Sequence, residues 1–262
     1  MTMSDDRVTP SPKQILAGAG ERIFRVLPAG VLANMVLPGS ENALLWNLVY
    51  PLAQPTVRLV DLLGARPLWG TPLSGDEFVD ELKPYFWGYS VEGERLEGLD
   101  AVLARVDGQG PRTEVDLYLR GANHLVVAEV KNLAIPGRCS RYTAGRCPEI
   151  HIEESVLRDP CRYWEHDGAR FETALDFGER PVPGNESPPC DRHYQLSRTL
   201  LVGLSLAERL GLTLHLWLVT PSEAWPHLER GWLDFAGRVR DEGLWRRLRV
   251  LPWEVIQAIA RG

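Results

Sequence analysis

Hydrophobic and polar residues alternate with two different periods along the chain, and the change of period separates helices from strands. The stretch SENALLWNLVYPL (40–52) places apolar residues at helical spacing behind Ser40, which can cap a helix, so it predicts a first helix. After a Pro- and Gly-rich stretch, GDEFVDELKPYF (75–86) predicts a short helix. Short apolar runs separated by turn-like sequences then predict an antiparallel meander. These runs are AVLARV (101–106), TEVDLYLR (113–120) and HLVVAEVK (124–131).

The second half of the chain returns to regular periodicity after a long irregular segment. Residues 134–191 are rich in Pro, Gly, Arg and Cys, and we interpret them as an insertion. A strong helical pattern at 192–211 is followed by a buried-strand pattern, TLHLWLVT (213–220), and helical patterns at 225–242 and 247–261 close the chain. A strand that follows a long helix usually returns parallel to its sheet, so we expect an α/β fold with a mixed central sheet flanked by helices.

Length and composition suit a folded domain of ordinary character. The 262 residues can bury a substantial core, and we expect one domain over 14–262 behind a flexible tail, 1–13. The tail lacks the apolar stretch of a signal peptide, and no apolar run is long enough to cross a bilayer, which predicts a cytoplasmic protein that does not contact membranes. The net charge of −6 gives no overall attraction for nucleic acid, so phosphate contacts would need local basic residues or bound cations.

Two charged residues interrupt the apolar run of HLVVAEVK near its C-terminal end. Side chains alternate between the faces of a strand, so Glu129 and Lys131 share one face. If the hairpin loop before this strand has an even number of residues, Asp116 lies opposite Glu129, and Glu114 lies opposite Lys131. An odd-numbered loop would move these side chains to opposite faces and leave an ordinary sheet edge.

Facing carboxylates repel each other unless a cation lies between them. Mg²⁺ takes hard oxygen ligands, and Asp116 with Glu129 supplies two of them. Lys131 could then orient a water molecule or stabilise charge on a phosphate. The pattern therefore indicates metal-assisted phosphodiester hydrolysis. The alternatives are a solvated rim or an ordinary cross-strand ion pair between Glu114 and Lys131, on an unrelated α/β protein.

The spacing of these residues resembles the PD-(D/E)xK nuclease superfamily, which has the restriction-endonuclease-like fold. The motif EVD (114–116), followed after twelve residues by EVK (129–131), matches the family pattern, without the proline that often precedes the Asp. The family core consists of a helix, three meander strands, a helix and a further strand, and the predicted order of elements is similar to it. The resemblance implies a divergent member of this superfamily with a cysteine-containing insertion.

The resemblance also implies roles for particular residues. Asp116 and Glu129 would bind Mg²⁺ or Mn²⁺, Lys131 would serve the attacking water, and Glu41 on the first helix would be an auxiliary acid. The implied substrate is nucleic acid, and DNA is the first candidate. A helicase or a restriction or repair protein is a possible partner that would deliver it. Some relatives carry a Gln and, four residues later, a Tyr on the second helix, whereas here Gln195 is followed by Thr199. Gln195 and Arg198, three residues apart, would still lie on a similar helix face; both are candidates for substrate binding, and a solvated polar face is the alternative.

The insertion contains every cysteine of the chain. A segment with little apolar content is hard to order by packing alone, so a structural Zn²⁺ or an iron–sulfur cluster is one interpretation, and ordinary thiols are the other. The spacings contain no C-x₂-C pair. The four candidate ligands are Cys139, Cys147, Cys161 and Cys190. Arginines of the same segment could follow a nucleic-acid backbone, or merely keep the loop soluble; they are Arg138, Arg141, Arg146, Arg158 and Arg162.

Two classes of function therefore compete. The first is a divalent-metal-dependent nuclease of the PD-(D/E)xK type. The second is a non-catalytic, nuclease-like module that binds nucleic acid or assembles with other proteins, organised by a cysteine-bound metal. The acidic charge favours the second class, whereas the complete set of two acids and a lysine favours the first.

Overall fold

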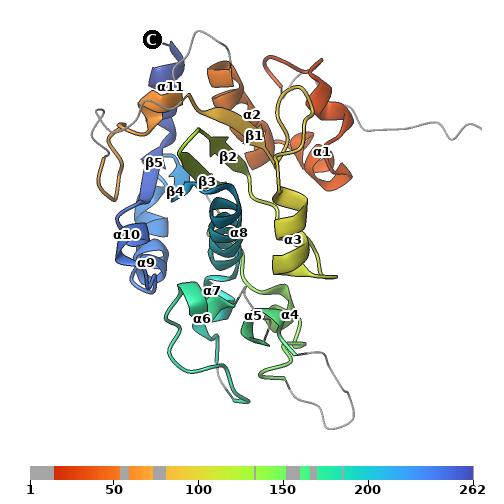
Figure 1. Ribbon diagram of the computed structural model, residues 1–262, viewed down its shortest axis with the longest axis vertical. Coiled ribbons are helices and arrows are strands. Elements are labelled where there is room, and N and C mark those ends of the chain that lie inside the picture. Colours follow the sequence, from red (N-terminus) through yellow and green to blue (C-terminus); the bar gives the residue numbers. More distant parts are fainter. Residues whose placement is uncertain are drawn as a thin grey trace, which may run out of the picture.

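The fold is organised around one mixed five-stranded sheet, as the computed structural model shows (Figure 1). The strands are β1 (Lys83–Phe86), β2 (Leu117–Arg120), β3 (His124–Val130), β4 (Thr213–Thr220) and β5 (Leu248–Pro252). They lie side by side in chain order; β1, β2 and β3 pair antiparallel, whereas β3, β4 and β5 pair parallel. The expected α/β class with a mixed sheet is confirmed. The structure describes residues 15–53, 59–72, 81–132, 134–151, 160–165, 170–184 and 186–261.

Helices cover both faces of this sheet. Apolar residues of α3, α6, α8 and α9 form one buried cluster, and those of α1, α2 and α11 form a second cluster on the opposite face. The longer helices are α1 (Ala29–Met35), α2 (Glu41–Val49), α3 (Leu99–Asp107), α8 (Tyr194–Leu210), α9 (Trp225–Ala236) and α11 (Trp253–Arg261). The short ones are α4 (Ser140–Thr143), α5 (Arg162–Glu165), α6 (Phe171–Ala174), α7 (Pro189–Arg192) and α10 (Glu242–Trp245), with 3-10 turns η1 (Arg22–Arg25), η2 (Tyr50–Ala53) and η3 (Leu59–Leu62). Within the described part of the chain, no helix has both the length and the apolar content to cross a membrane.

Several predicted elements are confirmed nearly to the residue. Helix α2 begins directly after Ser40, whose hydroxyl accepts a hydrogen bond from the Ala43 N–H at 3.3 Å. Helix α8 ends before Gly211, which adopts the left-handed conformation at φ +68° and so stops the helix. Strand β4 matches its predicted range, 213–220. Strong periodicity and clear capping residues therefore located these elements.

The predicted first strand of the meander is wrong, because residues 101–106 belong to helix α3. The apolar residues follow the helical spacing i, i+3, i+4, i+7 only when Leu99 is counted with Val102, Leu103 and Val106, all of which are buried. A window of six residues, 101–106, is too short to distinguish the period of a strand from that of a helix.

The first strand of the meander is instead β1, within the stretch predicted as a helix. Residues 83–86 of that stretch form an edge strand, where Pro84 is tolerated because its missing N–H faces no further strand. Residues 75–80, the first half of the predicted helix, lie outside the described residues.

The predicted register between β2 and β3 is confirmed. Leu117 pairs with Ala128 and Arg120 pairs with Leu125, around a turn closed by a 2.8 Å hydrogen bond from the Gly121 N–H to the His124 carbonyl. Continued by one residue, the same register sets Asp116 opposite Glu129. Their face is the one that α8 covers, because the neighbouring side chains of that face, Tyr118 and Val127, belong to the same buried cluster as α8.

The insertion, 134–191, contributes side chains to the hydrophobic core. It carries the short helices α4 to α7, and its buried side chains Trp164, Phe171 and Leu175 belong to the cluster that also contains α8. In Figure 1 these short helices gather at the end of α8 that is farther from α11.

Helix α8 packs closely on the sheet at Gly203, which allows a paired test of this contact. A Cβ atom at Gly203 would lie 3.0 Å from both Leu214 Cδ1 and Val127 Cγ2, whereas one at exposed Gly231 in α9 would meet nothing within 4 Å. We expect Gly203→Val to lower the free energy of unfolding by about 2 kcal/mol through overpacking. Gly231→Val should leave it unchanged or raise it by less than about 1 kcal/mol, since valine forms helices better than glycine. Urea unfolding of both variants measures this, and equal effects would contradict the close contact.

Candidate active site

Two carboxyl groups meet where β2 begins and β3 ends. Asp116 lies just before β2, and its Oδ2 accepts a 2.8 Å hydrogen bond from the Val130 N–H. Glu129 is the penultimate residue of β3 and is fully buried. The two carboxyl groups also hydrogen-bond to each other. The structure therefore brings together the two acids that the sequence pattern pairs.

Lys131 and Glu41 complete this group from two different elements. Lys131 Nζ lies 2.8 Å from Glu129 Oε1 and 3.4 Å from Glu41 Oε2. Glu41 begins α2, on the other face of the sheet, and reaches around the end of β3 to accept a 2.8 Å hydrogen bond from the Asn132 N–H. Lys131 thus directs its ammonium group to Glu129 and Glu41 rather than making the simple cross-strand pair with Glu114.

Helix α8 covers Glu129 with polar side chains near its own N-terminus. Gln195 Nε2 donates a hydrogen bond to Glu129 Oε1, and the Thr199 hydroxyl lies 3.4 Å from Glu129 Oε2. The side-chain oxygen of Gln195 accepts a 2.6 Å hydrogen bond from the Gly137 N–H, which ties the start of the insertion to the same group. Gln195 therefore contacts the predicted site directly.

Burial raises the pKa of both carboxyl groups. Burial, followed by the charge of Asp116, raises the pKa of Glu129 to about 8. Burial also raises the pKa of Asp116, against the lowering effect of Lys131. The pair therefore retains a proton near neutral pH.

Lys131 remains an ammonium ion in this setting. Burial alone would lower its pKa, but the charges of Glu129, Asp116 and Glu41 outweigh burial and raise the pKa above its ordinary value. Lys131 thus supplies positive charge rather than a basic nitrogen.

Arg198, the second substrate-binding candidate, lies farther along α8 and is engaged elsewhere. Its guanidinium bonds to Asp107 Oδ1 at 3.1 Å and to the Pro111 carbonyl at 2.7 Å, and it packs on the rings of Tyr163 and Tyr194. It still lines a cavity beside the site, so its contact with substrate stays a prediction.

That cavity opens next to Gln195 and is rich in arginine. Its volume is about 270 Å³, and it is bordered by Arg112, Arg138 and Arg198 together with Glu114 and Gln195. Because Gln195 also contacts Glu129, the cavity adjoins the carboxyl pair.

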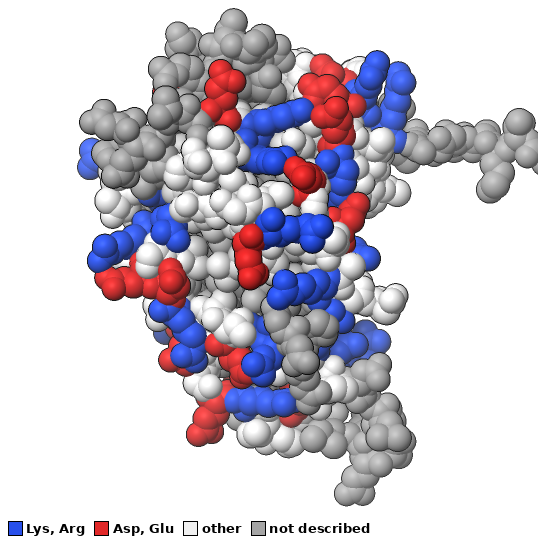
Figure 2. Space-filling view, viewed as in Figure 1, with Lys and Arg blue, Asp and Glu red and all other residues white. Residues whose placement is uncertain are grey.

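The arginines of the insertion have different surroundings. Arg138 pairs with buried Asp191, and Arg162 donates to the carbonyls of Val106 and Arg105, where it caps the C-terminal end of α3. Arg141 and Arg146 are exposed. Arg158 lies outside the described residues. Basic and acidic side chains are interleaved over the face seen in Figure 2.

All four cysteines line one small cavity. They are Cys139, Cys147, Cys161 and Cys190, none of which forms a disulfide. The cavity has a volume of about 20 Å³. Burial raises the pKa of both Cys161 and Cys190 to about 12, so these thiols stay protonated at neutral pH when unligated. Among the described residues, no group of three or more His, Cys, Asp or Glu side chains is placed to hold a single metal ion.

Comparisons of the chain with protein-family models, curated proteins and solved structures found no match. The assignment to the nuclease superfamily and the predicted site roles therefore stay predictions.

Sequence reasoning missed two parts of this region. Thr199 counts in the sequence only as a departure from the family pattern. It lies on the same face of α8 as Gln195, which stands four residues before it, and that spacing was the available signal. Buried Asp107 lies in a stretch that the sequence pattern predicts as a turn, yet it accepts hydrogen bonds from Thr113, Tyr163 and Arg198. Nothing in the local pattern indicates this network, since Tyr163 and Arg198 lie far from Asp107 in the chain.

The carboxyl pair predicts a titration that one substitution should change. In Asp116→Asn the negative charge next to Glu129 is lost, and the new amide can donate a hydrogen bond, so the pKa of Glu129 should fall from about 8 toward ordinary glutamate values. NMR titration of ¹³C-labelled glutamate carboxyl groups measures this. Asp100→Asn, at an exposed residue paired with Arg95, is the matched control and should leave the pKa of Glu129 unchanged. An equal response of the two variants would show that Asp116 does not set the charge state of Glu129.

Proposed function

We propose that this protein is a divalent-metal-dependent nuclease of the PD-(D/E)xK type, with a restriction-endonuclease-like core, which hydrolyses phosphodiester bonds in DNA. The observation that carries the proposal is the convergence of Asp116, Glu129, Lys131 and Glu41 at one end of β3. These residues come from three separate elements, and a solvated sheet edge would give no reason for a half-buried Asp116 to contact a fully buried Glu129.

The donor atoms at the site suit Mg²⁺ or Mn²⁺. Such ions bind carboxylate oxygens and complete their coordination shell with water and phosphate oxygens. Two carboxylates from the protein are therefore enough to hold one ion. Asp116 and Glu129 repel each other in a buried setting, and a cation between them would turn this repulsion into attraction. When bound there, the ion would supply Lewis-acid activation of the phosphodiester and lower the pKa of a water molecule.

Lys131 supplies fixed positive charge to the reaction. Its ammonium group, held by Glu129 and Glu41, can donate hydrogen bonds to the attacking water or to a phosphate oxygen as negative charge develops. Glu41 orients Lys131 while its other oxygen is held by the Asn132 N–H. Gln195 restricts the rotation of Glu129, because it donates to one of the two carboxylate oxygens.

The neighbouring cavity supports a polyanionic substrate. Arg112, Arg138 and Arg198 border it, and guanidinium groups form paired hydrogen bonds to phosphate oxygens. The chain as a whole carries a charge of −6, so contact with DNA would depend on such local arginines and on the metal ion.

The proposal predicts cleavage that depends on the metal and on the site residues. With Mg²⁺ or Mn²⁺, the protein should cleave single-stranded, double-stranded or branched DNA. Asp116→Asn and Lys131→Ala should each reduce the rate by at least about 100-fold, because each removes charge stabilisation at the reacting phosphate. Gel assays with end-labelled DNA measure the rates.

The controls for this assay are Asp100→Asn and Lys83→Ala, which remove the same charges at exposed surface pairs. Both should cleave like the wild-type protein. Equal rates in all five proteins would mean that a contaminating nuclease cuts the DNA, and the assignment would fail.

The raised pKa of Glu129 predicts that metal affinity depends on pH. Metal binding requires ionised carboxylates, whereas the pair retains a proton below about pH 8. Affinity for Mn²⁺ should therefore rise between pH 6.5 and 8, by up to about tenfold per pH unit for one displaced proton, and level off above pH 8. Isothermal titration calorimetry in buffers of different ionisation enthalpy measures both the affinity and the released proton. A flat profile would contradict metal binding at this pair.

The same calorimetry separates the nuclease from the rival function, a non-catalytic module with a nuclease-like fold. Such a module has no need of a cation at Asp116 and Glu129. Undetectable Mn²⁺ binding at millimolar concentration, together with binding of DNA, would favour the module.

A further inference from the structure

The four cysteines approach one another although they are spread over a long irregular segment. Cys139 precedes α4, Cys161 precedes α5 and Cys190 lies within α7. Each thiol is close enough to the other three to interact with them electrostatically, and all four border the same cavity. An insertion with ordinary thiols would have no reason to bring every cysteine of the chain to one point.

Hydrogen-bond donors point at these sulfur atoms. The backbone N–H groups of Arg141 and Tyr142 are directed at the Cys139 sulfur, and that of Tyr163 is directed at the Cys161 sulfur. Donors of this kind stabilise sulfur that carries negative charge, and they tune iron–sulfur sites.

The indole N–H of Trp164 adds a side-chain donor to these backbone donors. Trp164 is 5% exposed and lines the cavity, and its side chain donates a hydrogen bond to the Cys190 sulfur. A sulfur that carries negative charge would strengthen this hydrogen bond.

The arrangement of the thiols distinguishes between a single ion and a cluster. A zinc ion would draw four sulfur atoms to about 2.3 Å from one point. The described residues contain no group placed to hold one ion in this way. In a [4Fe–4S] cluster each of four cysteines binds a different iron, so the four cysteine sulfur atoms surround a larger volume.

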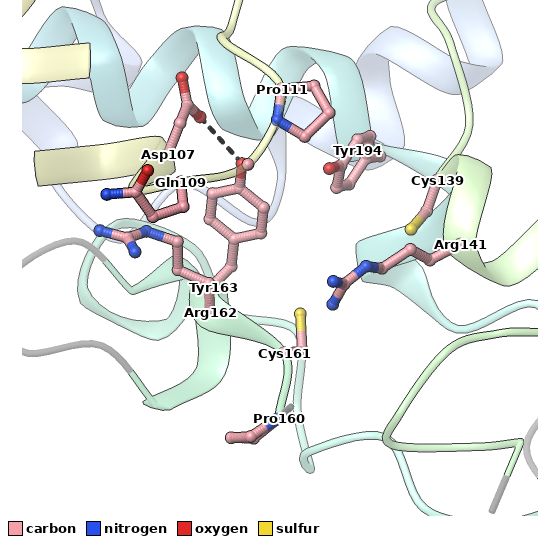
Figure 3. Close-up of a pocket in the computed structure, with 11 residues that line it drawn as sticks. Asp107, Gln109, Pro111, Cys139, Arg141, Pro160, Cys161, Arg162, Tyr163 and Tyr194 are labelled. Atoms are coloured by element: carbon pink, nitrogen blue, oxygen red, sulfur yellow. Dashed lines mark hydrogen bonds between the residues drawn. The ribbon is translucent and has the colours of Figure 1, made fainter. Parts of the chain in front are cut away.

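Space for such a cluster borders the thiols. Cys139 and Cys161 also line a larger cavity of about 530 Å³, whose lining residues are drawn in Figure 3. In the same view Arg141 extends into the space between Cys139 and Cys161. Its positive charge there would partly neutralise the negative charge of a thiolate-bound cluster. Tyr142, Phe171 and Tyr194 enclose the thiols with aromatic rings.

We propose that Cys139, Cys147, Cys161 and Cys190 bind a [4Fe–4S] cluster that cross-links the insertion to helix α8. Cys190 lies in α7, the short helix that precedes α8, and Cys139 lies two residues after Gly137, which bonds to Gln195. The cluster thus joins both ends of the insertion next to the helix that covers Glu129. The cluster site uses no residue of the nuclease site, so it stands whether or not the proposed function does.

Metal analysis of the whole protein tests this proposal. Protein purified without oxygen, or reconstituted with ferrous iron and sulfide, should contain about four iron and four sulfide ions per chain and show broad visible absorption that dithionite bleaches. Stoichiometric zinc without iron would overturn the cluster and leave a zinc site. Absence of both metals after reconstitution would overturn any metal at these cysteines.

Substitution identifies the ligands. Cys139→Ser, Cys147→Ser, Cys161→Ser and Cys190→Ser should each lower the iron content at least about twofold and change the electron paramagnetic resonance spectrum of the reduced protein. Circular dichroism shows whether each variant folds; if a variant does not fold, the iron and sulfide content of the wild-type protein still decides the proposal. Full iron retention in all four folded variants would contradict it.

Asp116→Asn is the matched control, since it changes the proposed nuclease site and spares every cysteine. It should bind iron and sulfide like the wild-type protein while losing DNA cleavage. Iron loss in this variant would show that the two sites are not separate, whereas an iron-replete protein that cleaves no DNA would reject the nuclease function alone.

Discussion

The hairpin register between β2 and β3 is the constraint on which the rest of the candidate site depends. A short turn after Gly121 aligns the two strands, and the period of two along a strand then decides which side chains share a face. With this register Asp116 and Glu129 lie together under α8. A slip by one residue would turn one of the two acids to the other face and separate them.

The rest of the site compensates for the repulsion that this register creates. Glu129 is fully buried, so its charge would be unfavourable if it were alone. Lys131 provides the opposite charge, Gln195 and Thr199 provide hydrogen bonds, and the N-terminal end of α8 adds a favourable dipole. These groups do not fully offset burial, because the pKa of Glu129 still lies near 8. The remaining imbalance is what a divalent cation would correct.

The insertion is connected to this region through helix α8. Gln195 binds Glu129 with one end of its side chain and the Gly137 N–H with the other, so the same residue touches the carboxyl pair and the start of the insertion. Arg162 and Tyr163 donate hydrogen bonds to α3, and Phe171 packs in the buried cluster that also contains α3 and α8. A cross-link at the cysteines would therefore order a segment that supports the site from outside, by limiting the positions that α8 can take.

Local sequence determined those features whose signal lies within one element. Helices α2 and α8 carry a stripe of apolar residues with a clear start or stop, and β4 is a continuous apolar run, so their positions followed from periodicity. The pairing of Asp116 with Glu129 also followed, because the turn between them is short and the period of a strand is two.

Tertiary structure decided the features that depend on which surfaces pack together. The run at 101–106 fits either period, and it forms a helix because Leu99 and Val106 can both reach the core beside α8. The meeting of Glu41 with Lys131 joins residues 90 positions apart from opposite faces of the sheet. The gathering of the cysteines likewise depends on how the short helices of the insertion fold back on α8. No local period encodes such contacts, since they arise from burial of apolar surface that distant segments share.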